Sequence, residues 1–334
     1  MASTETVVVT GASAGIGRAV VRRFAEDGAS VGLIGRNAAG LDGAREDVEA
    51  GGGQAHIATA DVADPDAVES AATAIEDALG PIDVWVNNAM TTVFAFFDDI
   101  EPDEYRRATE VTYLGTVWGT RTALGRMLAR DRGTIVQVGS ALAYRGIPLQ
   151  APYCGAKHGV KGFTESVRTE LRHRGSRVHV TMVQLPGLNT PQFDHCRSKM
   201  PRHPMPVAPV FQPELAADAV HWASHHRRRE VYVGLPAVYT ILGSKLAPWL
   251  AERYLARTAV KGQQTGDPPT PDNRNGNLFH SVNSSDPGAH GAFDDMARAR
   301  SAQWWTSRHR LALGAAGVAG AAALAERFLL GRRG

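Results

Sequence analysis

The residues best suited to proton-transfer chemistry are a tyrosine and a lysine four positions apart, Tyr153 and Lys157. This spacing puts both on one face of a helix, and Pro152 suits the first turn of such a helix. A phenol with its ordinary pKa of about 10 exchanges protons poorly at neutral pH, and a nearby cation lowers that pKa. A tyrosine and a lysine at this spacing are common on helix faces, so a catalytic role for the pair depends on Ser140. Its hydroxyl, just after a β-branched run, can stabilise a developing alkoxide.

A second candidate is the glycine-rich stretch Thr10–Gly17, which follows the first β-branched run and opens the first helical pattern. Glycines let the backbone turn tightly and approach a pyrophosphate, and a helix N-terminus supplies N–H groups and a positive dipole end. The position of this stretch favours nucleotide binding over a simple turn. The residues expected at the cofactor from this motif are Thr10, Gly11, Ser13, Gly15, Ile16 and Gly17.

The residue type that follows the second strand indicates which nicotinamide cofactor is bound. Sites that bind NAD place an acidic residue there to accept from the adenosine ribose. Here Gly35 removes the carboxylate, and Arg36 offers a guanidinium to a 2′-phosphate. The sequence favours NADP(H) over NAD(H), although a surface arginine at a strand end would look the same.

The elements that must position these residues alternate along the first 235 residues. Short β-branched runs predict seven strands, at 7–9, 31–34, 55–59, 84–86, 134–138, 178–183 and 231–233. Helical patterns lie between them, near 15–26, 38–50, 65–79, 102–130, 152–174 and 213–226. Strands separated by helices pair in parallel through βαβ crossovers. The expected fold is therefore an α/β doubly wound (Rossmann) seven-stranded parallel sheet, with its ligand site at the carboxyl ends of the strands.

Composition changes after the expected catalytic domain, 1–235. Residues 236–261 predict one apolar helical extension, 262–291 a Gly-, Pro- and Asn-rich linker without order, and 292–334 a helical tail. The 334 residues have a net charge of +2, which gives no reason to expect nucleic acid as a partner. The two cysteines form neither a disulfide framework nor a metal site, and the N-terminus shows no secretory signal. We expect a cytoplasmic protein without a metal.

Taken together, these motifs resemble those of the short-chain dehydrogenase/reductase family. Thr10–Gly17 matches that family's Thr-Gly-x-x-x-Gly-x-Gly signature, and Ser140, Tyr153 and Lys157 fall on its catalytic serine, tyrosine and lysine. The resemblance covers about residues 4–235. Further cofactor contacts that it implies are Asp61 and Val62 at the adenine, Asn87 and Ala89 in an Asn-Asn-Ala turn, and Pro186, Gly187 and Thr190 at the nicotinamide end.

The resemblance also implies an activity. Tyr153 exchanges a proton with the substrate oxygen, Lys157 binds the nicotinamide ribose and lowers the pKa of Tyr153, and Ser140 polarises the carbonyl. The implied enzyme is an NADP-dependent oxidoreductase acting on a CH–OH group or its carbonyl. Family members are commonly dimers or tetramers, which implies a homo-oligomer through the helices at 102–130 and 152–174.

Two positions depart from the family pattern. Met90 stands where a glycine usually follows the Asn-Asn-Ala turn, and Thr112 stands where the family has a catalytic asparagine that holds a water. A threonine offers one hydroxyl in place of an amide, so the proton relay changes. A non-catalytic NADP-binding regulatory protein on this fold is the alternative that Thr112 keeps open. The glycine spacing argues against a nucleotide-sugar epimerase or dehydratase.

Segments expected to rim the substrate site are mostly apolar: 93–97, 142–144 and 188–211. They predict a lipophilic ketone, aldehyde or alcohol as substrate, unless the same residues only pack the core. In the tail, Trp304 and Trp305 precede a run of residues from 311 to 325 without a charge. Three readings stay open for it: a soluble helix or partner contact, peripheral membrane attachment, or a membrane span.

Overall fold

The structure is a computed structural model that describes residues 4–281, 285–310 and 312. Its main sheet has seven strands in the order β3-β2-β1-β4-β6-β7-β9, and each neighbouring pair is parallel. This confirms the doubly wound fold and all seven predicted strands. The strands are β1 Thr6–Thr10, β2 Ser30–Gly35, β3 Ala55–Thr59, β4 Val84–Asn87, β6 Thr134–Ser140, β7 His179–Leu185 and β9 Glu230–Tyr232. A separate small sheet pairs β5 Val93–Phe94 with β8 Arg197–Ser198.

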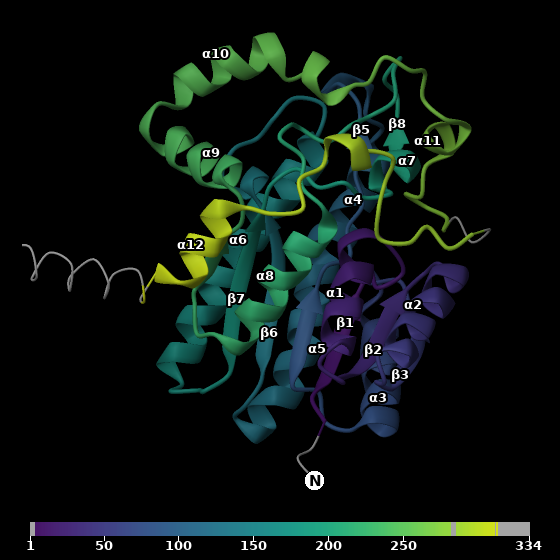
Figure 1. Ribbon diagram of the computed structural model, residues 1–334, viewed down its shortest axis with the longest axis vertical. Helices are drawn as coiled ribbons and strands as arrows, with labels where there is room; N and C mark the ends of the chain where they lie inside the picture. The colour runs from purple at the N-terminus through teal and green to yellow at the C-terminus, as the bar shows by residue number, and fades with distance from the viewer. Residues whose placement is uncertain (1–3, 282–284, 311, 313–334) are drawn as a thin grey trace, which may run out of the picture.

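Helices cover both faces of the main sheet (Figure 1). One layer holds α1 Gly15–Ala25, α2 Ala38–Ala50 and α8 Pro213–His225, whose apolar side chains share a core with the central strands. The other layer holds α3 Pro65–Leu79, α5 Gly115–Arg130 and α6 Ala151–His173. Because β-branched residues fill both faces of the strands, the sheet is buried between the two layers. The carboxyl ends of the strands lie at the top of the view in Figure 1, where the site-forming loops meet.

Two of the predicted helices are interrupted. The segment predicted at 102–130 consists of α4 Pro102–Thr109, a π-helical turn at Glu110–Leu114, and α5. The segment predicted as one helix at 236–261 consists of α9 Leu235–Leu246 and α10 Pro248–Thr258. Pro248 causes the second break, since it has no N–H to donate and disfavours helical backbone in the residue before it.

Residues 262–291 differ from the linker expected from their composition. They include the short helix α11 Pro271–Asn275, and the described part packs along the domain. Gln263, Asn273 and Leu278 have 0% of their surface exposed. The amide of Asn273 donates to the carbonyls of Phe193 (2.7 Å) and Cys196 (3.2 Å). Polar and main-chain contacts hold this segment, so apolar periodicity could not reveal it.

The beginning of the tail is the short helix α12 Ala302–Arg308, after a 3-10 turn at Asp294–Met296. Trp304 is buried against α8 and donates from its indole to Asp218 at 2.7 Å, whereas Trp305 is exposed. The two tryptophans therefore do not form the paired interface anchor considered from the sequence. The uncharged run that follows lies outside the described residues. Among the residues that are described, none of the helices has the length and apolar character needed to cross a bilayer.

Candidate active site

The glycine-rich loop connects β1 to α1 as the sequence predicted. Gly11 and Gly15 have φ values of 68° and 56°, a region that favours glycine. Gly17 lies so close to the loop that a Cβ there would be 2.0 Å from the Gly11 carbonyl oxygen. These positions let the loop turn tightly and bring the N-terminus of α1 to the edge of a pocket.

The loop after β4 supports the glycine loop from one side. The Thr10 hydroxyl accepts hydrogen bonds from the backbone N–H of Asn88 (3.0 Å) and of Ala89 (3.1 Å). The Asn88 amide donates to the Thr10 carbonyl at 3.0 Å. Thr10 is thus a buried residue that supports the loop after β4, and it does not line the pocket.

Asn87, expected at the cofactor, has a different position in the structure. Its amide nitrogen donates to Thr120 (3.0 Å) and Gln137 (2.9 Å), and its oxygen accepts from the Trp85 indole (2.8 Å). These bonds tie β4 to α5 and β6 in the interior. Asn88, its neighbour, lines the pocket instead.

The pocket above the glycine loop contains most of the predicted cofactor residues. Its lining includes Gly11, Ser13, Gly15, Ile16, Arg36, Asp61, Val62, Ala89 and Thr190. Met90 also lines it, so the residue that replaces the usual glycine faces the cofactor region. Arg36 lies beside Asp61, with 3.8 Å between guanidinium nitrogen and carboxylate oxygen, and Arg107 forms an ion pair with the same carboxylate. Both arginines lower the pKa of Asp61, against the effect of its burial.

The far wall of this pocket was not predicted from the sequence. Residues 276–281 and 285–291, here called the C-terminal strap, cross the carboxyl edge of the sheet over α1 and β2 (Figure 1). Arg36 donates to the carbonyls of Asn277 (2.6 Å) and Phe279 (3.3 Å). The Gly15 N–H, at the start of α1, donates to the Gly288 carbonyl at 2.9 Å.

Two side-chain contacts fix the strap further. Asp286 accepts from the buried Arg18 of α1 at 2.8 Å, and Arg107 donates to the Leu278 carbonyl at 3.1 Å. Strap residues that line the pocket are Asn277, Ser281, Ser285 and Pro287. Main-chain carbonyls carry much of this contact, and they leave no side-chain signal in the sequence.

The three predicted catalytic residues lie together in an adjoining pocket. Ser140 ends β6, and Tyr153 and Lys157 lie in the first two turns of α6. The Lys157 ammonium is 5.6 Å from the centre of the Tyr153 ring and donates to the Val138 carbonyl at 2.7 Å. Pro186, Gly187 and Thr190 line the same pocket. The two pockets share Ile16, Asn88, Met90, Thr190 and Gln192, so they adjoin one another, and we call the pair of pockets the hollow.

Burial dominates the acid–base properties of this cluster. It raises the pKa of Tyr153 to about 12, against the opposing effect of the Ser140 hydroxyl, and it lowers the pKa of Lys157 to about 8. The expectation that Lys157 lowers the pKa of Tyr153 does not hold in this structure. Removal from water disfavours both the phenolate and the ammonium. Tyr153 is therefore protonated at neutral pH and able to donate.

Thr112 has no exposed surface and lies in the π-helical turn. Its hydroxyl donates to the Thr91 carbonyl at 2.8 Å and accepts from the Thr91 N–H at 3.0 Å. The hydroxyl proton is therefore used within the protein. The residue holds the loop after β4 against the turn, a different arrangement from an asparagine that holds a water.

The pocket that contains Tyr153 is mainly apolar, as expected, but its lining differs from the prediction. Of the expected segments, 188–211 contributes Leu188, Phe193 and Pro206–Ala208, and 142–144 contributes only Leu142. Residues 93–97 do not line it, because Val93–Ala95 are core residues and Phe96 and Phe97 face solvent. Polar members include Arg145, whose Nε is buried without a hydrogen-bond partner.

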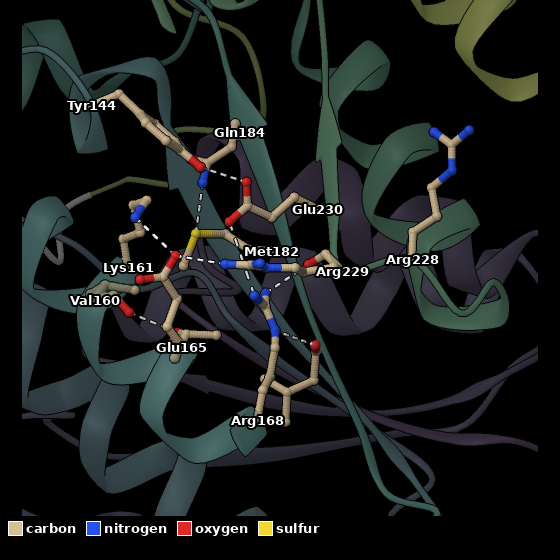
Figure 2. A network of polar contacts seen from close by, with 12 residues as sticks. Tyr144, Val160, Lys161, Glu165, Arg168, Met182, Gln184, Arg228, Arg229 and Glu230 are labelled. Atoms are coloured by element: carbon tan, nitrogen blue, oxygen red, sulfur yellow. Dashed lines mark hydrogen bonds and ion pairs between the residues drawn. The ribbon is translucent and has the colours of Figure 1, made fainter. Parts of the chain in front are cut away.

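Tyr144 belongs to a separate polar network (Figure 2). Its hydroxyl donates to Glu230 of β9, and Arg168 lies close to the same carboxylate. The ammonium groups of Lys161 and Lys245 lie 5.1 and 5.3 Å from the centre of the Tyr144 ring. This network fixes the end of α6 to the sheet edge and takes Tyr144 away from the substrate pocket.

Comparison with known proteins gives consistent matches. A family model described as short chain dehydrogenase matches residues 5–201. The chain is 31% identical over 269 residues to the uncharacterized oxidoreductase YxnA of Bacillus subtilis. This match covers 80% of this chain and 76% of YxnA. A match of that length extends beyond residue 235.

Two further matches and one solved structure are informative. The chain is 31% identical over 222 residues to 3-dehydrosphinganine reductase of Danio rerio (64% of this chain, 66% of the relative). It is 36% identical over 183 residues to dehydrogenase/reductase SDR family member 7B of Rattus norvegicus (53% and 56%), so it spans just over half of that relative. A metagenomic short-chain oxidoreductase solved in complex with NADP superposes with a TM-score of 0.59 at 28% identity, covering 70% of this chain and 98% of that one.

Proposed function

Because this chain belongs to the short-chain dehydrogenase/reductase family, we propose that it transfers a hydride between NADP(H) and the carbonyl or alcohol carbon of an apolar substrate. The observation that carries this proposal is the pair of adjoining pockets described above. One end has the glycine loop and Arg36, and the other has Ser140, Tyr153 and Lys157 in an apolar wall.

The residues present fit a bound nicotinamide dinucleotide. The cradle at Gly17 has no room for a Cβ, and the N-terminus of α1 offers N–H groups for a pyrophosphate. At the adenosine end, Arg36 and Arg107 lie beside Asp61, so two cations are available to a 2′-phosphate. At the other end, Lys157 and Thr190 lie where the nicotinamide ribose and ring would be held. The bound cofactor supplies or accepts the hydride.

The chain's own residues then carry the proton and orient the substrate. Tyr153, protonated at neutral pH, donates to the carbonyl oxygen as the alcohol forms, and takes a proton back in the oxidation. Ser140 stabilises the charge that develops on that oxygen. Lys157, which is charged below about pH 8, binds the nicotinamide ribose in this proposal.

Apolar side chains around Tyr153 support a lipophilic substrate. Leu142, Ile147, Leu188, Phe193 and Val207 line the pocket, and Arg145 supplies one cationic group. A pocket of this kind takes an apolar body and fixes its orientation through few polar contacts. The relative named 3-dehydrosphinganine reductase, whose name gives a lipid ketone as substrate, agrees with this class.

Turnover of NADPH and NADH with a panel of apolar ketones and aldehydes tests the proposal. We expect NADPH oxidation by the wild type and a loss of at least about 100-fold in kcat for Tyr153→Phe, since general acid catalysis typically contributes 10²–10⁴-fold. Tyr105→Phe is a matched control, because Tyr105 does not line the hollow. Activity confined to small charged carbonyl compounds would contradict the substrate class.

A non-catalytic, NADP-binding regulatory protein is the second candidate. The two hydrogen bonds between Thr112 and Thr91 favour this candidate. The Thr112 hydroxyl, at the position of the family's asparagine, already donates its proton to Thr91. Tight NADPH binding without turnover on any carbonyl would support this candidate. Thr112→Asn would then be expected to restore activity.

A further inference from the structure

Helices α9 and α10 expose seven large apolar side chains, which we call the α9–α10 face. Figure 1 shows the two helices at the top of the view, beyond the carboxyl ends of the strands. The exposure is large, 85% for Leu246 and 61% for Trp249. The residues of the face are Leu235, Tyr239, Leu242, Leu246, Trp249, Leu250 and Tyr254. A soluble monomer rarely exposes a contiguous apolar patch of this kind without a function for it.

On α9 the exposed residues form one narrow stripe. Leu235, Tyr239, Leu242 and Leu246 fall within about 60° of the helix circumference, at about 100° per residue. The opposite side anchors the helix, because Ala237 and Ile241 are buried. The stripe is therefore the side of α9 that stays exposed when the opposite side packs on the domain.

On α10 the outward arc combines apolar and basic residues. Trp249, Leu250, Arg253, Tyr254 and Arg257 fall within about 140° of the circumference and are all exposed. None of the residues of α10 is fully buried. A surface helix with aromatic, leucine and arginine side chains on one arc is typical of helices that lie in a bilayer interface.

Charge identifies the class of surface that this face suits. Lys245, Arg253, Arg257 and Lys261 are basic, and Glu252 is the one acidic residue between 235 and 261. Glu252 pairs with Arg145 in the pocket wall at 3.4 Å but stays exposed, so the four basic residues outnumber one paired carboxylate. The outward charge is positive, so it complements anionic headgroups.

The face adjoins the substrate pocket. Pro236, Tyr239, Thr240 and Leu255 belong to α9 and α10 and also line the pocket of Tyr153. Tyr239 thus belongs both to the exposed stripe and to the pocket wall. This step rests on the proposed function, whereas exposure and charge do not depend on it.

We propose that the α9–α10 face docks on the surface of an anionic lipid bilayer, with both helices lying in the interface plane. Trp249, Tyr239 and Tyr254 lie at headgroup depth, and the leucines enter the acyl boundary. The basic side chains contact lipid phosphates. Docking in this orientation turns the substrate pocket toward the membrane, so an apolar substrate enters from the lipid phase.

Quenching of tryptophan fluorescence by brominated lipid tests the contact directly in the full chain. Vesicles of brominated phosphatidylcholine with phosphatidylglycerol should quench part of the emission of the wild type. That quenching should be lost in Trp249→Phe and retained in the matched control Trp305→Phe, since both tryptophans are exposed. Loss in Trp305→Phe instead would place the contact on the tail and overturn the proposal.

Vesicle co-sedimentation with Leu246→Glu/Leu250→Glu tests the apolar face. We expect binding at least about tenfold weaker than for the wild type, and unchanged binding for Phe97→Glu, an equally exposed apolar position outside the face. Vesicles without phosphatidylglycerol should bind several-fold less. Melting temperatures of the variants check that the fold is retained.

Two outcomes would overturn the proposal whatever the enzyme does with carbonyl compounds. One is absence of vesicle binding by the wild type. The other is a wild-type oligomer, seen by light scattering, that the double glutamate variant dissociates without any effect on lipid binding, because a second copy of the chain then covers the face. Loss of turnover with retained docking would refute the proposed function alone.

Discussion

Lys157 is buried with one acceptor, the Val138 carbonyl, and no carboxylate among the described residues affects its pKa. Burial alone therefore lowers its pKa to about 8. The side chain is charged below that pH and becomes neutral as the pH rises through it. Near neutral pH the site thus has a protonated phenol and a charged ammonium, the combination that reduction of a carbonyl requires.

The pH profile of kcat/KM for NADPH tests this assignment, because that ratio reports the free enzyme. We expect it to fall as the pH rises through about 8, as Lys157 loses the charge that binds the cofactor. Lys157→Arg keeps its charge throughout, so the fall at this pH should disappear even if the rate is lower. A wild-type profile that stays flat to pH 10 would contradict the assignment.

Thr112 holds the loop after β4 with two buried hydrogen bonds to Thr91. Thr112→Val should lower the free energy of unfolding by about 1–3 kcal/mol, because Thr91 then has a buried donor and acceptor without partners. Thr112→Ser keeps the hydroxyl and is the matched control. Urea unfolding measures both, and equal stability of the valine and serine variants would show that the pair contributes nothing.

Arg36 is the residue on which the proposed preference for NADPH would depend. Arg36→Ala should raise KM for NADPH by about 10- to 100-fold, since hydrogen bonds to charged groups contribute about 1.5–3 kcal/mol. KM for NADH should change little, because NADH has no 2′-phosphate. Steady-state kinetics with both cofactors make the comparison within one variant. An equal loss for the two would assign Arg36 to the strap alone.

At the scale of elements, the C-terminal strap distinguishes this chain from a bare dinucleotide-binding domain. Its carbonyls at Asn277 and Phe279 already accept from Arg36, and Gly288 accepts from the Gly15 N–H. A 2′-phosphate and a pyrophosphate would need the same donors. Binding of the proposed cofactor would therefore require the strap to release some of these contacts.

Asp286→Ala tests the strap, because it removes the ion pair with Arg18. The rate of NADPH release should rise by up to about fivefold, since a partly exposed ion pair contributes about 0.2–1 kcal/mol. Asp295→Ala removes the same charge from an exposed position outside the strap and should leave the rate unchanged. Stopped-flow displacement of bound NADPH measures both, and identical rates in the two variants would contradict a role for the strap.

At the scale of the whole molecule, the sequence predicted the elements that a repeating pattern of apolar residues specifies. The seven strands and the grouping of Ser140, Tyr153 and Lys157 follow from β-branched runs and from motif spacing. The break at Pro248 was missed, although proline ends helices and residues 236–261 were predicted as one helix. The direction of the Tyr153 pKa shift could not be predicted, because the effect of burial cannot be compared with the effect of a nearby charge before the fold is known.

The strap marks the other limit of prediction. Its Gly-, Pro- and Asn-rich composition indicated an unordered linker, but its contacts are carbonyl oxygens and single polar side chains such as Asn273. Such contacts follow no periodic pattern along the sequence and require no particular residue type. The lining of the substrate pocket was partly misassigned for a related reason, because the short sheet of β5 and β8 buries Val93 and Ala95 in one separate core and Phe94 in another.

The strap also has a consequence for how the protein is made. Asn277 and Asp286 of the strap bond to Arg36 and Arg18, across separations of 241 and 268 positions. A ribosome completes the whole parallel sheet before it synthesises these residues, and domains fold from the N-terminus during synthesis. The nascent enzyme thus passes through a stage with its adenosine edge open. The proposed cofactor could therefore bind at that stage, before about the last sixth of the chain is made.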